Sequence, residues 1–219
     1  MRRVSSEDDE TARSRHIEAM GQDLGSMYHS LASDLALLHT RWQIHRQLFG
    51  FSQARYDTLA RSAPKLFYLL QRLLWEDILL GIARMTDSPR SAGRANLTLR
   101  SLPSLVQDPE LQAAVDASLA SAINASEFAR QWRHRQLAHR DLDLALGGDA
   151  RPLPIPEVPE AEAALVSLGE VLNLLAVGHA QPPIAYELVD FGDVGVDDLI
   201  HLLNVGLDAE GEERVASGL

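Results

Sequence analysis

The sequence predicts an all-α protein with an antiparallel four-helix-bundle-like core and extra C-terminal helices. Leu and Ala recur at spacings of three and four residues, which is the helical period. Aromatic residues make up only 5% of the chain, and runs of β-branched residues are scarce. A chain of 219 residues is long enough for one domain with appendages and too short for two full domains.

The N-terminal residues predict a disordered tail over residues 1–20. Met1-Arg2-Arg3-Val4 is followed by Ser, Glu and Asp, where a signal peptide would need an apolar core. The longest apolar stretch, Leu66–Met85, is interrupted by charged residues and is too polar for a membrane span. We therefore expect a cytoplasmic protein that does not bind a membrane.

Three helices are predicted in the first part of the chain. The first runs from about Asp23 to Leu48 and carries an apolar stripe, and Gly50 ends it. A short helix follows at Ser52–Arg61, with Ser52 as its N-cap. The third begins near Pro64 and extends to about Thr86. Apolar residues surround almost all of this third helix, which predicts a central position with neighbours on several sides.

A loop and a long helix come next. Residues 86–96 are rich in Ser, Gly, Pro and Arg, which is typical of a loop. Asp108-Pro109-Glu110 is a cap, a first-turn proline and a first-turn acid, and it opens an Ala-rich helix expected to reach at least Gln136. Residues 21–147 would then form the helical bundle.

Glycine and proline residues predict a boundary after the bundle. Two glycines at 147 and 148 and four prolines up to position 159 favour a stiff connection over 148–159. Residues 160–219 are expected to form a C-terminal helical appendage. It would contain a helix at Glu160–Val177 and a short one at Asp197–Val205, each ended by the next glycine.

Composition excludes several classes of protein. The chain has 20 Lys and Arg against 31 Asp and Glu, and its net charge of −11 argues against coating DNA or RNA through bulk charge. It contains no Cys, which excludes disulfides, thiolate metal sites and a Cys nucleophile. Lys65 is the only lysine, and no phosphate-binding P-loop is present. The histidines show no metal-ligand spacing, so we expect no metal and no cofactor.

One basic segment stands out against the acidic chain. Four Arg, two His and a Trp lie within residues 130–141. One interpretation is a solvated helix end, where the helix dipole favours cations. The other interpretation comes from a family pattern. Arg133, His134 and His139 match the Arg-polar-x-His signature of the HEPN superfamily, and Leu137–Asp141 resembles its abortive-infection, AbiU-type branch.

The resemblance extends from about Leu24 to Leu146, including the helix end at Asp87 and the segment Leu97–Leu105. It implies a four-helix bundle that dimerises so that two copies of the motif face one cleft. It also implies a metal-independent RNA endonuclease with a toxin or phage-defence role, in which Arg133, His134 and His139 are the catalytic residues. The alternative is a non-catalytic helical module that binds a protein or a nucleotide.

These residue types suit RNA cleavage. The 2′-OH of RNA can attack the adjacent phosphate, so an enzyme must move a proton and stabilise extra negative charge on phosphorus. Imidazole does the first and guanidinium the second. On a continuous helix, His139 lies about 120° from Arg133 and about 40° from Arg135, so Arg135 is the better partner by geometry. The resemblance selects Arg133 first, and Arg135 is kept as a supporting residue.

Acidic residues of the third helix are candidates for a supporting role. Asp77 is in phase with Leu70, Leu73 and Leu74, which predicts that it is buried and paired with an arginine or histidine. Glu76 either pairs with Arg72 one turn earlier or, like Asp77, orients a side chain of residues 133–139.

The end of the third helix adds two more charged residues, Arg84 and Asp87. They are three residues apart and either extend the same network or close the helix end.

One position departs from the pattern of related toxins. HEPN toxins that are paired with nucleotidyltransferase antitoxins often carry a tyrosine two residues after the histidine, and here that residue is Asp141. We expect no partner of that kind. The partners that the sequence predicts are an RNA substrate, a second copy of the chain, and an antitoxin or regulator of unknown type.

Overall fold

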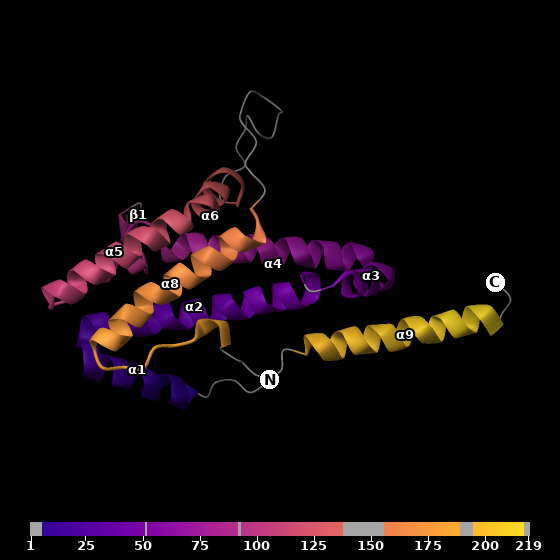
Figure 1. Ribbon diagram of the computed structural model, residues 1–219, viewed down its shortest axis with the longest axis horizontal. Helices are drawn as coiled ribbons and strands as arrows, with labels where there is room; N and C mark the ends of the chain where they lie inside the picture. Colours follow the sequence, from indigo (N-terminus) through magenta and orange to yellow (C-terminus); the bar gives the residue numbers. More distant parts are fainter. Residues whose placement is uncertain (1–5, 51, 92, 138–155, 189–194, 217–219) are drawn as a thin grey trace, which may run out of the picture. The chain divides into compact units, whose positions relative to one another are not determined.

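A computed structural model describes residues 6–50, 52–91, 93–137, 156–188 and 195–216, and it confirms the all-α class. Strand is confined, in these residues, to a hairpin of two residues on each side. Figure 1 shows the elements. The main helices are α1 (Ser6–Met20), α2 (Gln22–Phe49), α3 (Gln53–Ser62), α4 (Pro64–Met85), α5 (Pro109–Ala125), α6 (Glu127–Trp132), α8 (Val158–Gly178) and α9 (Val196–Ala216). Shorter elements are β1 (Arg90–Ser91), β2 (Arg94–Ala95), η1 (Leu99–Ser101), η2 (Pro103–Leu105), η3 (Arg133–Leu137) and η4 (Tyr186–Leu188).

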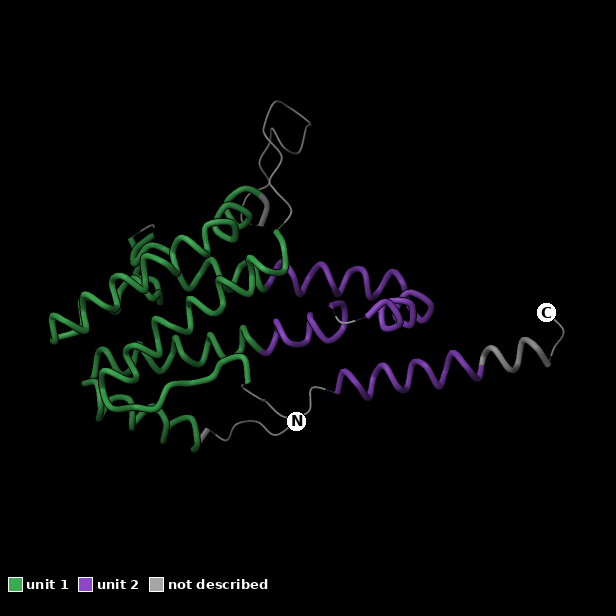
Figure 2. The backbone as a smooth tube through the Cα atoms, in the orientation of Figure 1, with its two compact units in different colours: residues 1–39, 78–189 green, residues 40–77, 190–219 purple. Residues whose placement is uncertain are grey.

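The chain divides into two compact units, shown in Figure 2. Unit 1 comprises residues 1–39 and 78–189, and unit 2 comprises residues 40–77 and 190–219. The division falls inside α2 and α4, so it differs from the predicted boundary at 148–159. Residues 148–155 lie outside the described residues, whereas Val158 and Pro159 already belong to α8.

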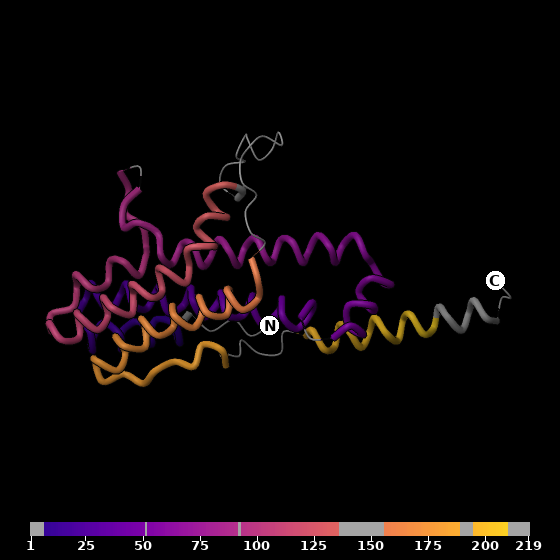
Figure 3. The backbone as a smooth tube through the Cα atoms, turned by 45° about the horizontal axis from the view of Figure 1, so that its top comes forward, coloured from indigo at the N-terminus to yellow at the C-terminus, as the bar shows by residue number. Residues whose placement is uncertain are grey.

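Unit 1 contains the antiparallel bundle. The start of α2, the end of α4, α5 and α8 run alternately in opposite directions (Figures 1 and 3). Two glycines allow these helices to approach closely. A Cβ at Gly81 would lie 2.7 Å from Leu38 Cδ1, and a Cβ at Gly178 would lie 2.5 Å from Leu111 Cδ2. The core is made of side chains with almost no exposure, including Tyr28, Leu31, Leu35, Ile78, Leu79, Ile82, Val115, Leu165, Leu168 and Leu172.

The placement of α8 corrects the prediction of a C-terminal appendage starting at residue 160. α8 packs against α5, and its leucines at 165, 168, 172 and 175 are buried in the unit 1 core. In the described part of the chain, α8 is also the helix that is long and apolar enough to cross a membrane, but half of its most apolar stretch is buried. Its length and hydropathy are those of a helix at the centre of a bundle.

The N-terminal segment is a helix, not the disordered tail that its charge predicts. Gly21, with φ +84°, turns the chain between α1 and α2. His16 lies edge-on to Tyr28 with ring centroids 4.8 Å apart, and His29 pairs with Asp9 at 3.3 Å. At Gly25, a Cβ would lie 2.4 Å from the His16 carbonyl oxygen, so this glycine lets α1 lie directly against α2. Tertiary contacts therefore order a segment with little apolar periodicity.

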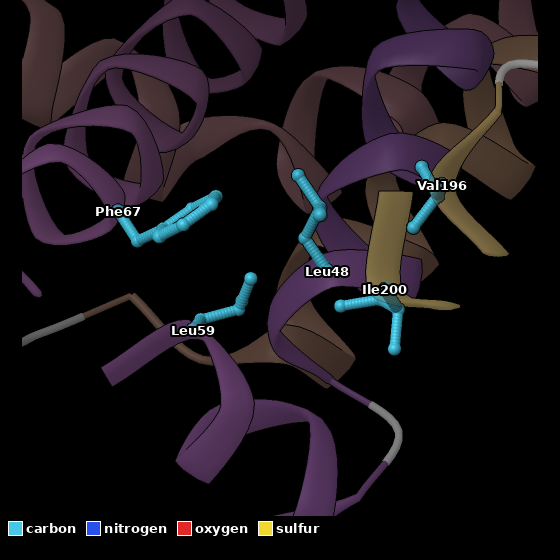
Figure 4. Close-up of a cluster of buried hydrophobic side chains, with 5 residues drawn as sticks. All are labelled: Leu48, Leu59, Phe67, Val196 and Ile200. Carbon is cyan, nitrogen blue, oxygen red and sulfur yellow. The ribbon is translucent and has the colours of Figure 1, made fainter. Parts of the chain in front are cut away.

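Unit 2 has its own small core, shown in Figure 4. Side chains from α2, α3, α4 and α9 meet there, and the buried ones are Leu48, Leu59, Phe67, Val196 and Ile200. Polar contacts join α3 to α9: Arg55 pairs with Asp197 at 2.7 Å, and Thr58 donates a hydrogen bond to Asn204 Oδ1 at 2.8 Å. α9 continues past Gly206 to Ala216, although Gly206 was expected to end it. Gly206 does not adopt a positive φ, so it does not form a helix cap.

The first half of α4 corrects the prediction that this helix is surrounded on all sides. Leu66, Tyr68, Leu69 and Leu73 are 60%, 68%, 46% and 50% exposed. The second half behaves as predicted, since Ile78, Leu79, Ile82 and Ala83 are fully buried. The apolar residues all around α4 therefore have two different roles. In its second half, in unit 1, they are buried, and in its first half, in unit 2, several of them form an exposed apolar face.

Candidate functional site

The predicted motif begins at a change of helix type. α5 ends at Ala125, and Ser126, with φ −92° and ψ 2°, interrupts the helix that was expected to continue to Gln136. Figure 3 shows α6 leaving the line of α5. From Arg133 to Leu137 the chain forms one π-helical turn, η3, a geometry that is often found at functional sites. The regular spacing of about 100° per residue that favoured Arg135 over Arg133 does not apply through this turn.

Arg133 is held by an acidic residue that lies just after the end of α4. Its Nη1 pairs with Asp87 Oδ1, and the Arg133 and Asp87 side chains are 35% and 20% exposed. Among the described residues, Asp87 is the partner of this guanidinium. Asp87 directly follows the last turn of α4, and its carbonyl oxygen accepts a 2.8 Å hydrogen bond from Thr98 Oγ1. The pair therefore fixes the guanidinium at the surface of unit 1 without burying it.

Arg130 fastens α6 to the same end of α4. Its Nη1 donates to the buried Thr86 Oγ1 at 2.8 Å, and its Nη2 donates to the Ile123 carbonyl oxygen at 2.7 Å and pairs with Glu127. The hydrogen bond from Arg130 holds the pKa of the Glu127 carboxyl below its usual range. Arg130 is thus a structural arginine, and it keeps the α6–η3 segment in one place.

Thr98 closes the base of the loop between α4 and η1. It is fully buried, and its hydroxyl lies within hydrogen-bonding distance of the carbonyl oxygens of Met85, at 3.1 Å, and Asp87, at 2.8 Å. The same hydroxyl accepts from the Arg100 backbone N–H at 3.3 Å, which caps η1. The hydrogen bonds of Thr98 therefore fix the backbone at both ends of the loop, including the backbone at Asp87.

The other predicted site residues fall into three groups. His134 is exposed and Arg135 is half-buried, and both lie on η3 beside Arg133. Arg84 is exposed on the last turn of α4. His139, the predicted catalytic histidine, lies outside the described residues, as does Asp141. Of the predicted site residues, the structure therefore brings Arg133 into contact with Asp87.

Asp77 corrects the prediction of a buried carboxylate. It does pair with an arginine, Arg41 Nε at 3.2 Å, but its side chain is 48% exposed. The helix phase placed it beside leucines that were assumed to be buried, and one of these, Leu73, is 50% exposed. Glu76 pairs with Arg72 Nε at 3.1 Å, as the surface interpretation predicted. Both acids thus have partners in unit 2, and neither pair includes a residue of the 133–139 segment.

The principal residue that sequence reasoning undervalued is Asp87. It was considered only together with Arg84, as an extension of a network or a helix end. Its signal was available, because the helix end Arg84-Met85-Thr86-Asp87 and the segment Leu97–Leu105 were both part of the family resemblance. These two segments supply Thr86, Asp87 and Thr98 to the site.

Metal-ligand side chains do not gather in the described ranges, where no group of three or more His, Asp and Glu converges. The chemical groups that the site presents are guanidiniums and one imidazole ring, that of His134, on η3. Such groups bind phosphate oxygens and move protons.

The model of the HEPN AbiU2 family, described as AbiU2, matches residues 21–193. This match covers well over half of the chain, so the chain belongs to the HEPN AbiU2 family, an abortive-infection branch of the HEPN proteins. The resemblance predicted from residues 133–141 is thereby confirmed. The matched range extends beyond the expected end at Leu146 and includes α8, in agreement with the place of α8 in the bundle. No curated protein and no solved structure matches the chain.

Proposed function

We propose that this protein is a metal-independent RNA endonuclease of the HEPN type that acts in the cytoplasm as a toxin of abortive infection. Family membership supports the biological role. The observation that carries the chemical proposal is the Arg133–Asp87 pair, because it holds a guanidinium in a fixed, accessible position at the start of the Arg133–His139 signature. A fixed guanidinium is what stabilisation of a phosphorane requires.

The proposed reaction uses RNA as its own nucleophile. The 2′-oxygen forms a bond to the adjacent phosphorus, and the bond from phosphorus to the 5′-oxygen breaks. The products are a 2′,3′-cyclic phosphate and a 5′-hydroxyl. His139 takes the proton of the 2′-OH or gives one to the departing 5′-oxygen, since imidazole exchanges protons near neutral pH. No metal or cofactor is needed for these steps.

Arg133 is assigned to the negative charge that develops on the non-bridging phosphate oxygens. Its planar guanidinium can donate two parallel hydrogen bonds to a phosphate. Asp87 acts as a positioning residue, because it restrains Nη1 while Nε and Nη2 have no other partner among the described residues. His134 is assigned a supporting role, since it is exposed on the same turn as Arg133. Arg135 is the alternative principal arginine.

A homodimer would double the reacting groups around one scissile phosphate. One copy of the motif supplies a single His139, whereas the reaction needs both a base and an acid. We expect a two-fold dimer in which the two Arg133–His139 segments face each other, in line with the dimerisation that is typical of HEPN domains. Sedimentation at micromolar concentration should give twice the 24.1 kDa chain mass. A clean monomer would contradict this arrangement.

The activity of such a nuclease has to be controlled in the cell. The proposed regulator is an antitoxin or trigger that is not a nucleotidyltransferase, because Asp141 occupies the position of the modifiable tyrosine. An aspartate offers no phenolic hydroxyl for nucleotide transfer.

The proposed function is tested by incubating the purified full-length protein with mixed cellular RNA in excess EDTA. The protein should cleave the RNA, and a His139→Ala variant purified in parallel should not. The parallel variant excludes a contaminating nuclease. Cleavage that stops in EDTA, or no cleavage at all by the unchanged protein, would contradict the proposal and favour a non-catalytic binding module.

A further inference from the structure

The proposed reaction does not use the β1–β2 hairpin. Arg90 pairs with Ala95 and Ser91 with Arg94 in antiparallel register, and Gly93 has φ +80° in the connection. The Asn96 amide donates to the Ser88 carbonyl oxygen at 2.8 Å and to Ser91 Oγ at 3.1 Å. The hairpin is therefore held by side-chain contacts at its base as well as by its backbone ladder.

The hairpin lies in a second basic segment of the acidic chain. Between residues 84 and 100 there are four arginines and one acid, Asp87, giving a local charge of +4 − 1 = +3 against −11 for the whole chain. The acid is already paired with Arg133. Arg90 and Arg94 are exposed, and no carboxylate of the described residues pairs with either of them. Two guanidiniums are thus presented to solvent and are not neutralised locally.

The hairpin is also tied to the proposed catalytic segment. Arg90 follows Asp87 by three residues, so their Cα atoms lie within about 11 Å of each other. On the other side of the hairpin, Thr98 bonds to the Asp87 carbonyl oxygen. Figures 1 and 3 show the hairpin and α6 projecting from the same side of unit 1. The hairpin is therefore joined at its base to Asp87, the residue that pairs with Arg133.

We propose that the β1–β2 hairpin is an RNA-binding arm, in which Arg90 and Arg94 bind backbone phosphates next to the scissile one. The proposal rests on the nuclease function proposed above. The ligand is single-stranded RNA, because attack by the 2′-oxygen in line with the departing 5′-oxygen needs a backbone free of the A-form helix. Contacts to phosphates position the strand without selecting a sequence. The arm thus binds substrate and transition state alike.

The pairing register gives the two arginines different faces of the hairpin. Residues that pair directly share a face, so Arg90 lies on the face of Ala95 and Arg94 on the face of Ser91. A single strand of RNA that follows one face contacts one arginine more closely than the other. The two single alanine variants therefore report which face the RNA follows.

The experiment measures the affinity of full-length protein for a fluorescent single-stranded RNA, with His139→Ala in every variant so that no cleavage occurs. Arg90→Ala with Arg94→Ala should weaken binding about 3- to 10-fold. The plot of log affinity against log salt has a negative slope, and this slope should become shallower by about 1.4 if both phosphate contacts are lost. Arg13→Ala, a substitution of an exposed arginine of α1, is the matched control for each single hairpin variant, which also loses one positive charge.

A kinetic comparison separates this role from a catalytic one. With His139 intact, the double hairpin variant should raise KM by the same 3- to 10-fold and leave kcat unchanged, since the contact is equal in the ground and transition states. Substitution of both arginines by lysine should restore most of the affinity, because lysine keeps the charge. Circular dichroism should show unchanged helix content.

The outcomes separate the two proposals. If the unchanged protein cleaves RNA and the hairpin variants bind it as tightly as the Arg13→Ala control, the arm is refuted and the nuclease stands. If the hairpin variants bind RNA more weakly but the unchanged protein does not cleave it, the RNA-binding role of the hairpin is supported and the nuclease function is refuted. If the chain does not bind single-stranded RNA at all, both are overturned.

Discussion

Replacement of His139 by alanine should lower the rate of RNA cleavage by about 10²- to 10⁴-fold, the range expected for loss of a positioned acid or base. An imidazole exchanges protons near neutral pH, whereas a guanidinium stays protonated, so neither Arg133 nor Arg135 can take the place of His139. The rate should be measured in single turnover with excess protein, so that product release does not hide the chemical step.

The matched control for this variant is His134→Ala. His134 is a second histidine of the same motif, exposed on η3, and its loss should reduce the rate less because it only supports the reaction. Both variants should keep the helical circular dichroism signal and the thermal midpoint of the unchanged protein. Cleavage at the full rate by His139→Ala would exclude proton transfer by this residue.

Replacement of Arg133 by alanine should lower the cleavage rate by about 10²- to 10³-fold, as removal of one donor to a developing oxyanion does. Arg133→Lys should recover only part of the loss, since an ammonium keeps the charge but not the planar two-pronged geometry. The measurement is again the single-turnover rate. Arg135→Ala should be measured in parallel with Arg133→Ala. The arginine whose replacement lowers the cleavage rate more is the one that contacts the phosphate.

Asp87→Asn tests whether Asp87 positions the guanidinium. The amide keeps an oxygen that can accept a hydrogen bond from Arg133 Nη1 but removes the charge, so kcat should fall by about tenfold while KM changes little. Combined with Arg133→Ala, the Asp87 substitution should add little further loss, because the two residues act as a unit. Full additivity of the two losses would show that Asp87 does not act through Arg133.

The local parts of the fold were predictable from the sequence. Ser52 caps α3 by accepting from the Arg55 N–H at 3.2 Å, and Asp108 caps α5 ahead of Pro109, both as their patterns indicated. Cap and proline signals depend on a few adjacent residues, which explains their reliability. The helix that was missed, α1, depends instead on contacts with α2, and its charged sequence carries no such signal.

Helix phase alone could not predict which residues are buried. Asp77 and Leu73 lie on a face of α4 that belongs to the apolar pattern but is exposed in unit 2. A helix that is apolar all round carries no information on which side is covered. The role of α8 was missed for a related reason, because the prolines before it indicated a boundary, while its partner α5 lies far away in sequence.

The sequence indicated candidate reactive residues for the site, but it did not indicate the residues that hold them in place. The signature named Arg133, yet its partner Asp87 lies 46 residues away and is brought to it by the end of α4. Arg130 was counted as part of a basic cluster, whereas its contacts with Thr86 and Ile123 make it structural. Distinguishing a reactive arginine from a structural one required the contacts of each guanidinium.

The most direct test of the central claim is the chemical nature of the cleaved ends. RNA cleaved in excess EDTA should carry a 2′,3′-cyclic phosphate on one fragment and a 5′-hydroxyl on the other, because the nucleophile is the RNA's own 2′-oxygen. An RNA with a single 2′-deoxyribose at the cleaved position should remain intact there. Fragments with a 3′-hydroxyl and a 5′-phosphate, or cleavage at the deoxyribose, would show that water is the nucleophile and would contradict the mechanism assigned to Arg133 and His139.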